Sequence, residues 1–222
     1  YRSRLVAQEI NQDKREDLFA ATPPLEAKKL LFSFAVTEGI GYKQNDRGNG
    51  MKIDFIDVRR AYFHARAIRE VYVKLPEEDY EEGMCGLLKK AMYGTRDAAQ
   101  NWAEAYMAFM VKAGFIRGKR SPCKFWHKES NLRVVVHGDD FTSLGTAANL
   151  KWLRDWVETK YDIKTEFLRP CYAHKVRALN RIVRWAETEI LNEAEPRHAK
   201  IIISQLGLSS AHSAFSTGLD DP

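Results

Sequence analysis

Residues 134–142 read VVVHGDDFT, an apolar run that breaks at Gly138 and continues into two adjacent carboxylates, Asp139 and Asp140. Strand-like composition resumes directly afterwards, so the stretch predicts a β-hairpin with two negative charges at its tip. Like charges placed side by side repel, and a fold keeps such a pair most readily where a cation neutralises both. The alternative is a solvated turn, because Asp and Gly are ordinary turn residues.

A third acid lies in a second apolar segment, residues 53–58, which read IDFIDV and are also strand-like. Carboxylate oxygens suit Mg²⁺, which completes its shell with waters and substrate phosphates. Three carboxylates on neighbouring strands could hold the two metal ions of an in-line phosphoryl transfer. Asp54 and Asp57 compete for the third position. They are three residues apart on a strand and therefore face opposite sides, so only one can point at the site.

The composition is that of a folded protein with one large or two small domains: 222 residues, of which 45% are hydrophobic. A formal net charge of +5 is compatible with a polyanionic partner. Arginine and lysine interleaved with aromatic residues are the mixture that a nucleic-acid groove uses, with cations for phosphates and rings for bases. An ordinary basic surface explains the charge alone equally well.

The three cysteines, Cys85, Cys123 and Cys171, are widely spaced and form no CxxC pair. This pattern argues against structural zinc and favours a reducing compartment. The apolar runs are too short to span a bilayer, so we expect no membrane association. The first residues already resemble the interior of a strand and no Met precedes them, which leads us to expect a fragment of a longer polypeptide.

Apolar periodicity predicts helices and strands that alternate irregularly. We expect an α+β fold, with an antiparallel sheet backed by helices and a small C-terminal extension. Thr95 or Asp97 is the expected N-cap of the second helix. The expected strands are residues 1–8, 53–58, 71–73, the 133–143 hairpin and 181–186, and the expected helices are residues 26–38, 61–64, 97–113, a helix opening at Thr146, and 197–206.

Several short blocks follow one another in a fixed order: residues 1–8 (YRSRLVAQ), 56–64 (IDVRRAYFH), 70–76 (EVYVKLP), 88–94 (LKKAMYG) with Trp102 downstream, 121–125 (SPCKF), 136–140 (VHGDD) and 196–198 (PRH). In this order the chain resembles the reverse transcriptases of copia-type retrotransposons, with the last block similar to the region leading towards RNase H. The resemblance covers nearly the whole chain. An ordered series of blocks is far more specific than an Asp-Asp pair alone.

The resemblance implies an RNA-directed DNA polymerase with a palm, fingers and the start of a thumb. Residues 1–168 would form the fingers and palm, and residues 169–222 a thumb- or connection-like extension leading towards a missing RNase H region. The implied partners are an RNA template, a DNA primer, deoxynucleoside triphosphates and the rest of a Pol polyprotein, including integrase. The expected location is the cytoplasm, a virus-like particle or the nucleus.

Residue by residue, the resemblance implies that Asp57, Asp139 and Asp140 are the catalytic, metal-binding acids, and the motif match favours Asp57 over Asp54. They would hold two Mg²⁺ ions, for which Mn²⁺ could substitute. One ion would activate the primer 3′-hydroxyl, and the other would bind the triphosphate and stabilise the leaving pyrophosphate.

Further residues match positions that contact the substrates. Tyr62 matches the aromatic residue that packs under the incoming sugar and excludes a 2′-hydroxyl, although a core tyrosine is an equally good interpretation. Arg2 and Arg4 share one strand face from which they could grip a triphosphate, or form a solvated basic edge. Lys89 and Lys90 are candidates for template or primer phosphates.

The chain departs from the family pattern at several positions. His137 stands where Tyr is frequent, and it can still stack on a primer or donate to it. Asp97 stands where Gln is common and Ala99 where Pro is usual; an acid at position 97 would repel a triphosphate unless it turns away as a helix cap. Two alternatives therefore stay open: a catalytically inactive, nucleic-acid-binding remnant, and a metal-dependent nuclease that uses the same carboxylates.

Overall fold

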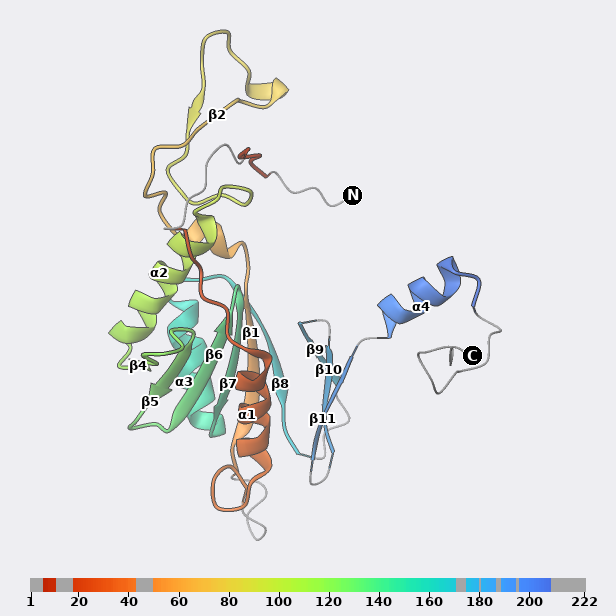
Figure 1. Ribbon diagram of the computed structural model, residues 1–222. Helices are drawn as coiled ribbons and strands as arrows, with labels where there is room; N and C mark the ends of the chain where they lie inside the picture. Colours follow the sequence, from red (N-terminus) through yellow and green to blue (C-terminus); the bar gives the residue numbers. More distant parts are fainter. Residues whose placement is uncertain are drawn as a thin grey trace.

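The main sheet of the protein has six strands in the order β4-β5-β6-β7-β1-β8, and each adjacent pair is antiparallel (Figure 1). The computed structural model describes residues 6–10, 18–42, 50–170, 175–179, 181–186, 189–194 and 196–208. The expected mixed fold with an antiparallel sheet is confirmed. The six strands are β1 (Lys52–Val58), β4 (Ile116–Arg117), β5 (Lys124–His127), β6 (Leu132–His137), β7 (Asp140–Gly145) and β8 (Ile163–Leu168).

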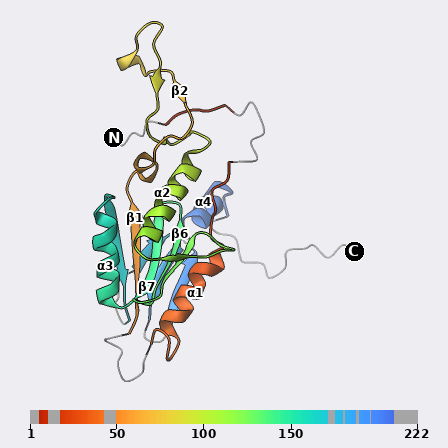
Figure 2. The same ribbon diagram turned by 90° about the vertical axis from the view of Figure 1, so that its left-hand side faces the viewer.

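Helices cover both faces of this sheet. One face packs on α2 (Ala98–Lys112) and α3 (Ala147–Glu158), while the other packs on α1 (Leu25–Val36). Figure 2 shows α3 and α1 on opposite sides of the sheet. Helices α1 and α2 begin and end within two residues of the expected bounds, and α3 begins directly after Thr146. Thr146 caps α3 as expected, since its side chain accepts a hydrogen bond from the Asn149 backbone N–H.

The alternation of β1 distributes its four apolar side chains over both faces of the main sheet. Ile56 and Val58 join the core beneath α2 and α3, where Trp102 is 1% exposed. Ile53 and Phe55 face the other way and pack with Leu31 of α1. A central strand that is buried on both faces reads as a continuous hydrophobic run, so the only polar positions in such a strand need an explanation.

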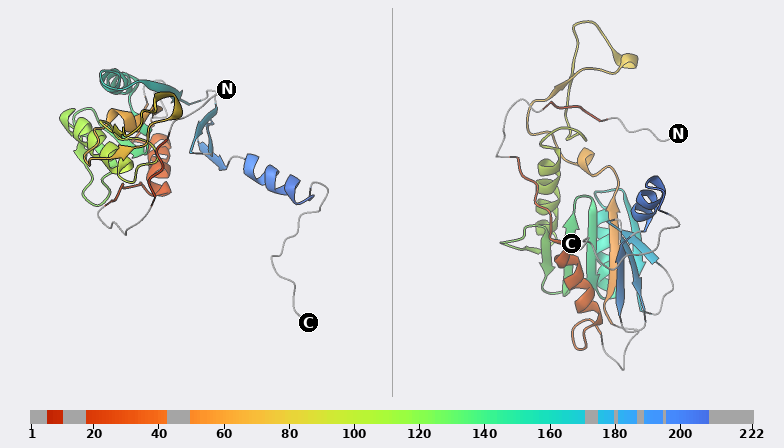
Figure 3. Two further views of the ribbon diagram at one scale, coloured as in Figure 1. Left: turned by 90° about the horizontal axis from the view of Figure 1, so that it is seen from above. Right: turned by 45° about the vertical axis from the view of Figure 1, so that its right-hand side comes forward.

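A second, three-stranded sheet continues the core on the α1 face. It has the order β11-β10-β9, and its Val183 and Trp185 are buried in the same cluster as Ile53. Its strands are β9 (Lys175–Ala178), β10 (Arg181–Trp185) and β11 (Ile190–Ala194). Helix α4 (Arg197–Gln205) follows and lies beyond this sheet, away from the main one (Figure 3).

A long excursion separates η1 (Ala61–His64), a 3₁₀ helix after β1, from α2. It contains the two-stranded pair β2 (Tyr72–Val73) and β3 (Gly86–Leu87), with η2 (Glu77–Asp79) between them. This segment, yellow in Figure 1, projects away from the main sheet. Its strands are held mainly by each other, which leaves large side chains such as Tyr72 and Met84 more than half exposed.

Some expectations from the sequence were wrong. Of the strand expected at residues 1–8, residues 6–8 are irregular, and the Ala7 N–H donates instead to the Tyr93 carbonyl at 2.8 Å; residues 1–5 lie outside the described part. The sequence patterns did not reveal β4, β5 and β8, which are short or carry exposed polar residues. Within the described ranges, no helix is both long and apolar enough to cross a bilayer.

Asp54 is the one acidic residue of β1 on the α2/α3 face, and it is fully buried. Its Oδ2 accepts a hydrogen bond from Arg154 of α3 at 3.2 Å, and its Oδ1 has no hydrogen-bond partner among the residues that the structure describes. Burial raises the pKa of Asp54 to about 6, against the opposing effect of Arg154. Asp54 therefore forms a structural ion pair with Arg154 on the α2/α3 face of the sheet.

This raised pKa predicts a pH-dependent stability. The folded state binds the Asp54 proton more tightly than the unfolded state, so the free energy of unfolding should fall as pH rises from about 4 to above 6. Asp54→Asn should reduce that fall by on the order of 2 kcal/mol. Urea unfolding at pH 4.5 and 7.5 measures the change in the free energy of unfolding between the two pH values, with the exposed Asp155→Asn as control. An equal change in Asp54→Asn and Asp155→Asn would contradict the raised pKa of Asp54.

Candidate metal and nucleotide site

The β6–β7 hairpin closes with a two-residue loop, Gly138 and Asp139, between the paired residues His137 and Asp140. Gly138 has φ +63°, as the first position of a type II′ turn requires, and this backbone conformation disfavours a side chain there. The hairpin expected from the sequence is confirmed, with its two acids at the tip and at the first position of β7.

Two hydrogen bonds tie the hairpin tip to neighbouring elements. The indole Nε1–H of Trp102 in α2 donates to the Gly138 carbonyl at 2.8 Å, and the Val58 N–H of β1 donates to the Asp139 carbonyl at 3.0 Å. Trp102, noted from the sequence as the tryptophan downstream of the 88–94 block, lies in the core beneath the main sheet. It is buried there, and its indole N–H also positions the loop that carries Asp139.

The register of β1 against β7 places Asp57 directly opposite Asp140. Residues directly opposite each other in an antiparallel pair project from the same face, so both carboxylates lie on the α1 face. Asp54 lies opposite Ser143 and projects from the other face, towards Arg154. The prediction that Asp54 and Asp57 face opposite sides is confirmed.

The three acids affect one another electrostatically. Burial raises the pKa of Asp140 to about 6; the positive charge of Lys28 opposes this, and the negative charges of Asp139 and Asp57 add to it. Burial followed by the charge of Asp139 raises the pKa of Asp57, against Lys164 and Arg59. A raised pKa in each of two neighbouring carboxylates marks a site where additional positive charge is stabilising.

The side chains of these carboxylates do not converge on one point in this structure. Among the residues that the structure describes, no three histidine, cysteine, aspartate or glutamate side chains converge closely enough to hold a metal ion. The donor chemistry nevertheless fits a hard divalent cation, because Asp57, Asp139 and Asp140 offer carboxylate oxygens, the ligands that Mg²⁺ prefers. Their mutual repulsion is what a bound cation would relieve.

A hollow of about 110 Å³ adjoins Asp57 and Asp140. Basic side chains surround the two acids in it: Lys28 of α1, Lys164 of β8 and Arg177 of β9. Lys164 also pairs with Glu166 at 2.9 Å, and Phe55 forms part of the wall. The hollow therefore combines three carboxylates, those of Asp57, Asp140 and Glu166, with cations from three separate elements, a charge pattern suited to metal ions and phosphate groups together.

Tyr62 lies in η1, close enough to the tip for the charge of Asp139 to contribute, after burial, to raising its pKa. Arg60 directly precedes η1 with φ +53°, a left-handed conformation that reverses the chain after β1. The half-buried Tyr62 ring stacks on Tyr93 with centroids 4.4 Å apart. Both interpretations of Tyr62 thus have support: it is packed, and it lies beside the acids.

The remaining predicted residues are more dispersed. His137 is half-buried next to the tip, where burial and the charge of Lys28 lower its pKa. Lys89 and Lys90 are exposed after β3, where Lys90 forms a bridge with Arg66, and neither lines the hollow. Arg2 and Arg4 lie outside the described residues.

Asp97 occupies the N-cap position of α2, one of the two positions expected, but its side chain makes no capping hydrogen bond. Its Oδ1 accepts a hydrogen bond from Arg69 at 2.9 Å, and its Oδ2 accepts one from Asn101 at 3.1 Å. Glu9 shares the Arg69 guanidinium, also at 2.9 Å. Because Arg69 compensates the Asp97 charge, the expected repulsion of a triphosphate by this acid is weakened.

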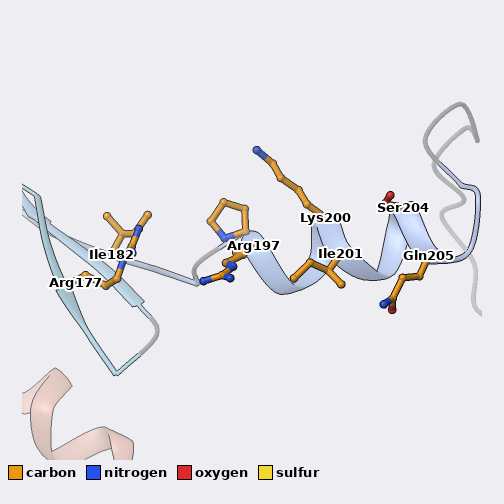
Figure 4. Close-up of a pocket in the computed structure, with 8 residues that line it drawn as sticks. Arg177, Ile182, Arg197, Lys200, Ile201, Ser204 and Gln205 are labelled. Atoms are coloured by element: carbon orange, nitrogen blue, oxygen red, sulfur yellow. The ribbon is translucent and has the colours of Figure 1, made fainter. Parts of the chain in front are cut away.

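A second hollow, of about 570 Å³, lies between the small sheet and α4 (Figure 4). Arg177, Arg197 and Lys200 line it together with Ile182 and Ile201. Arg177 thus borders both this hollow and the one beside Asp57 and Asp140. None of the three acids lines the second hollow, so its chemistry is that of a basic and apolar surface.

The tie between Trp102 and the hairpin tip can be tested separately from any activity. Trp102→Phe should lower the free energy of unfolding by about 1–2 kcal/mol, through the lost hydrogen bond and the smaller buried ring. It should also speed amide hydrogen exchange at residues 139 and 140. Trp152→Phe, at a 40% exposed position, is the control and should change stability by less than about 0.5 kcal/mol; unchanged exchange in Trp102→Phe would contradict the tie.

Comparison with known proteins identifies the family. The family model described as "Reverse transcriptase (RNA-dependent DNA polymerase)" matches residues 1–174. The chain is 23% identical, over 174 residues, to the Retrovirus-related Pol polyprotein from transposon TNT 1-94 of Nicotiana tabacum; the match covers 74% of this chain and 12% of that protein. It is 26% identical, over 118 residues, to the Transposon Ty1-BL Gag-Pol polyprotein of Saccharomyces cerevisiae, covering 52% of this chain and 7% of that one.

Among solved structures, an apo telomerase from Candida tropicalis, truncated from its C-terminal domain, superposes with a TM-score of 0.45 at 10% identity, covering 78% of this chain and 40% of that chain. The matched region is a small part of the curated Pol polyproteins, 12% and 7% of their lengths. The chain belongs to the reverse transcriptase family and is similar to the copia-type Pol polyproteins of retrotransposons.

Proposed function

We propose that this chain is an RNA-directed DNA polymerase domain of a copia-type retrotransposon and that Asp57, Asp139 and Asp140 are its metal-binding acids. The main observation in support is the β1–β7 register, which puts Asp57 opposite Asp140 on one sheet face, with Asp139 at the adjoining tip. In this proposal the six-stranded sheet with its helices is the palm, and the β2–β3 excursion belongs to the fingers.

In the proposed mechanism the protein supplies position and charge, with no protein nucleophile. Asp57 and Asp140 would hold divalent cations on the α1 face, and Asp139 would complete the set from the hairpin tip. Two bound Mg²⁺ ions would supply activation of the primer 3′-hydroxyl and charge neutralisation at the triphosphate. The Trp102 and Val58 hydrogen bonds would hold the tip in register while the primer end approaches.

The surrounding cations suit a polyanionic substrate. Lys164 and Arg177 line the hollow with the acids, and Arg197 and Lys200 continue the positive charge onto α4. We propose that a nucleic-acid backbone follows this route, with Arg177 bordering both hollows. RNA as template and DNA as primer are part of this proposal, which the family match supports.

Tyr62 is the proposed contact for the sugar of the incoming nucleotide. Its position beside Asp139 and its stacking on Tyr93 support a rigid aromatic wall next to the metal-binding acids. A ring held in this way could reject a 2′-hydroxyl by steric exclusion, which is a discrimination of shape rather than of charge.

The catalytic acids are tested by primer extension on an RNA template with Mg²⁺ and deoxynucleoside triphosphates. Asp57→Asn, Asp139→Asn and Asp140→Asn should each reduce extension by at least about 100-fold, because each removes a charged ligand from the metals. Asp155→Asn removes an equally negative but exposed residue of α3, paired with Lys151 at 2.7 Å, and should leave extension unchanged.

Two other outcomes would contradict the proposal in distinct ways. RNA binding without nucleotide incorporation by the wild-type chain would support the alternative of an inactive, nucleic-acid-binding remnant. Asp140-dependent cleavage without incorporation would instead indicate a nuclease.

The role of Tyr62 predicts a change in sugar selectivity. Tyr62→Ala should raise incorporation of ribonucleotides relative to deoxyribonucleotides by roughly 10- to 100-fold, because the ring no longer blocks the 2′-hydroxyl. Tyr62→Phe keeps the ring and should retain the wild-type ratio. The measurement is the ratio of kcat/KM values for a matched nucleotide pair, and an unchanged ratio in Tyr62→Ala would show that Tyr62 serves packing alone.

A further inference from the structure

Lys28, the fourth residue of α1, is a buried lysine, and it belongs to none of the sequence blocks that carry the family resemblance. Its side chain is 4% exposed, and its Nζ has no hydrogen-bond partner among the described residues. A buried ammonium group without a partner destabilises a protein, and lysine normally avoids this by extending its amine into water. Lys29, the next residue, is exposed.

The surroundings of Lys28 explain why the charge is tolerated. Lys28 lines the hollow that also contains Asp57 and Asp140, and α1 packs across β7 and β1, the strands that carry these acids. Burial lowers the pKa of Lys28, and the negative charge of Asp140 opposes this by stabilising the ammonium form.

The remaining charged groups of the hollow have other partners or lie on other elements. Lys164 pairs with Glu166, and Arg177 belongs to β9 and also borders the second hollow. Lys28 is therefore the cation that α1 contributes from within the core, opposite the two carboxylates. A leucine or methionine would fill the same volume without the desolvation cost, so packing alone does not account for a lysine.

We propose that Lys28 is a fixed counter-cation of the Asp57–Asp140 pair, which steadies these carboxylates before metal binds and sets how tightly they then hold a divalent cation. This inference rests on the proposed function of the two acids as metal ligands. Lys28 acts as a positioning residue through the carboxylates.

The proposal predicts in which direction the charge of Lys28 changes the affinity for a divalent cation. A positive charge held beside two carboxylates repels an incoming divalent cation, so its presence weakens metal binding while preventing the acids from repelling each other apart. Replacing Lys28 by a neutral residue should therefore tighten metal binding. Damage to the fold could only weaken it, so tightening distinguishes this electrostatic role from a merely structural one.

The experiment measures Mn²⁺ binding by electron paramagnetic resonance of the free ion, without nucleic acid or nucleotide. Lys28→Met and Lys28→Gln should each lower the apparent Kd for Mn²⁺ by roughly tenfold. Lys28→Arg keeps the charge and should stay within about twofold of wild type, as should the exposed control Lys29→Met. Circular dichroism confirms that each variant is folded, and having two neutral variants guards against misfolding of either one.

The outcomes separate this inference from the function on which it rests. Asp140-dependent Mn²⁺ binding by the wild-type chain, with unchanged or weaker binding in both folded neutral variants, would overturn the role of Lys28 and leave the metal site intact. Wild-type binding that Asp140→Asn does not alter would overturn the metal site itself, and the role of Lys28 with it.

Discussion

The pairing register of β1 with β7 is the constraint on which the proposed chemistry depends. Six consecutive residue pairs, from Lys52 with Gly145 to Asp57 with Asp140, align the two acids at the end of the ladder. A slip of one residue would turn Asp57 towards α2 and α3 and bring Asp54 to the face with Asp140. The buried side chains on both faces of β1 oppose such a slip, because every one of them would change sides. Core packing thus sets the geometry of the acids.

Each face of β1 carries one acid, and the two are compensated differently. Asp54 is fully buried and hydrogen-bonds to Arg154, an arrangement that satisfies its charge within the protein. Asp57 is exposed beside Asp140 and Asp139. The cations near these acids, Lys28, Lys164 and Arg59, influence their pKa values through charge alone. Asp54 thus has a dedicated arginine partner at one carboxylate oxygen, whereas Asp57 and Asp140 share a hollow with several charges, the asymmetry expected of a structural acid and a metal-binding acid on the same strand.

The sequence predicted those features of the fold and the site that are set by residues close together in the chain. The hairpin followed from the apolar run 134–136 and Gly138, and the opposite faces of Asp54 and Asp57 followed from the two-residue period of a strand. The Arg69–Asp97 ion pair and the burial of Lys28 depend on contacts between residues far apart in the chain, so no local sequence pattern predicted them. The strand β8 was missed because exposed polar side chains interrupt its apolar pattern.

The central claim is that Asp57, Asp139 and Asp140 hold divalent cations on one face of the sheet. The most direct test is a crystal structure of the protein soaked with Mn²⁺ and a deoxynucleoside triphosphate, with anomalous scattering used to locate the metal. The account predicts anomalous peaks within about 2.0–2.3 Å of carboxylate oxygens of Asp57 and Asp140. Peaks confined to other residues, or Asp57 turned away from the hairpin tip in the presence of metal, would contradict it.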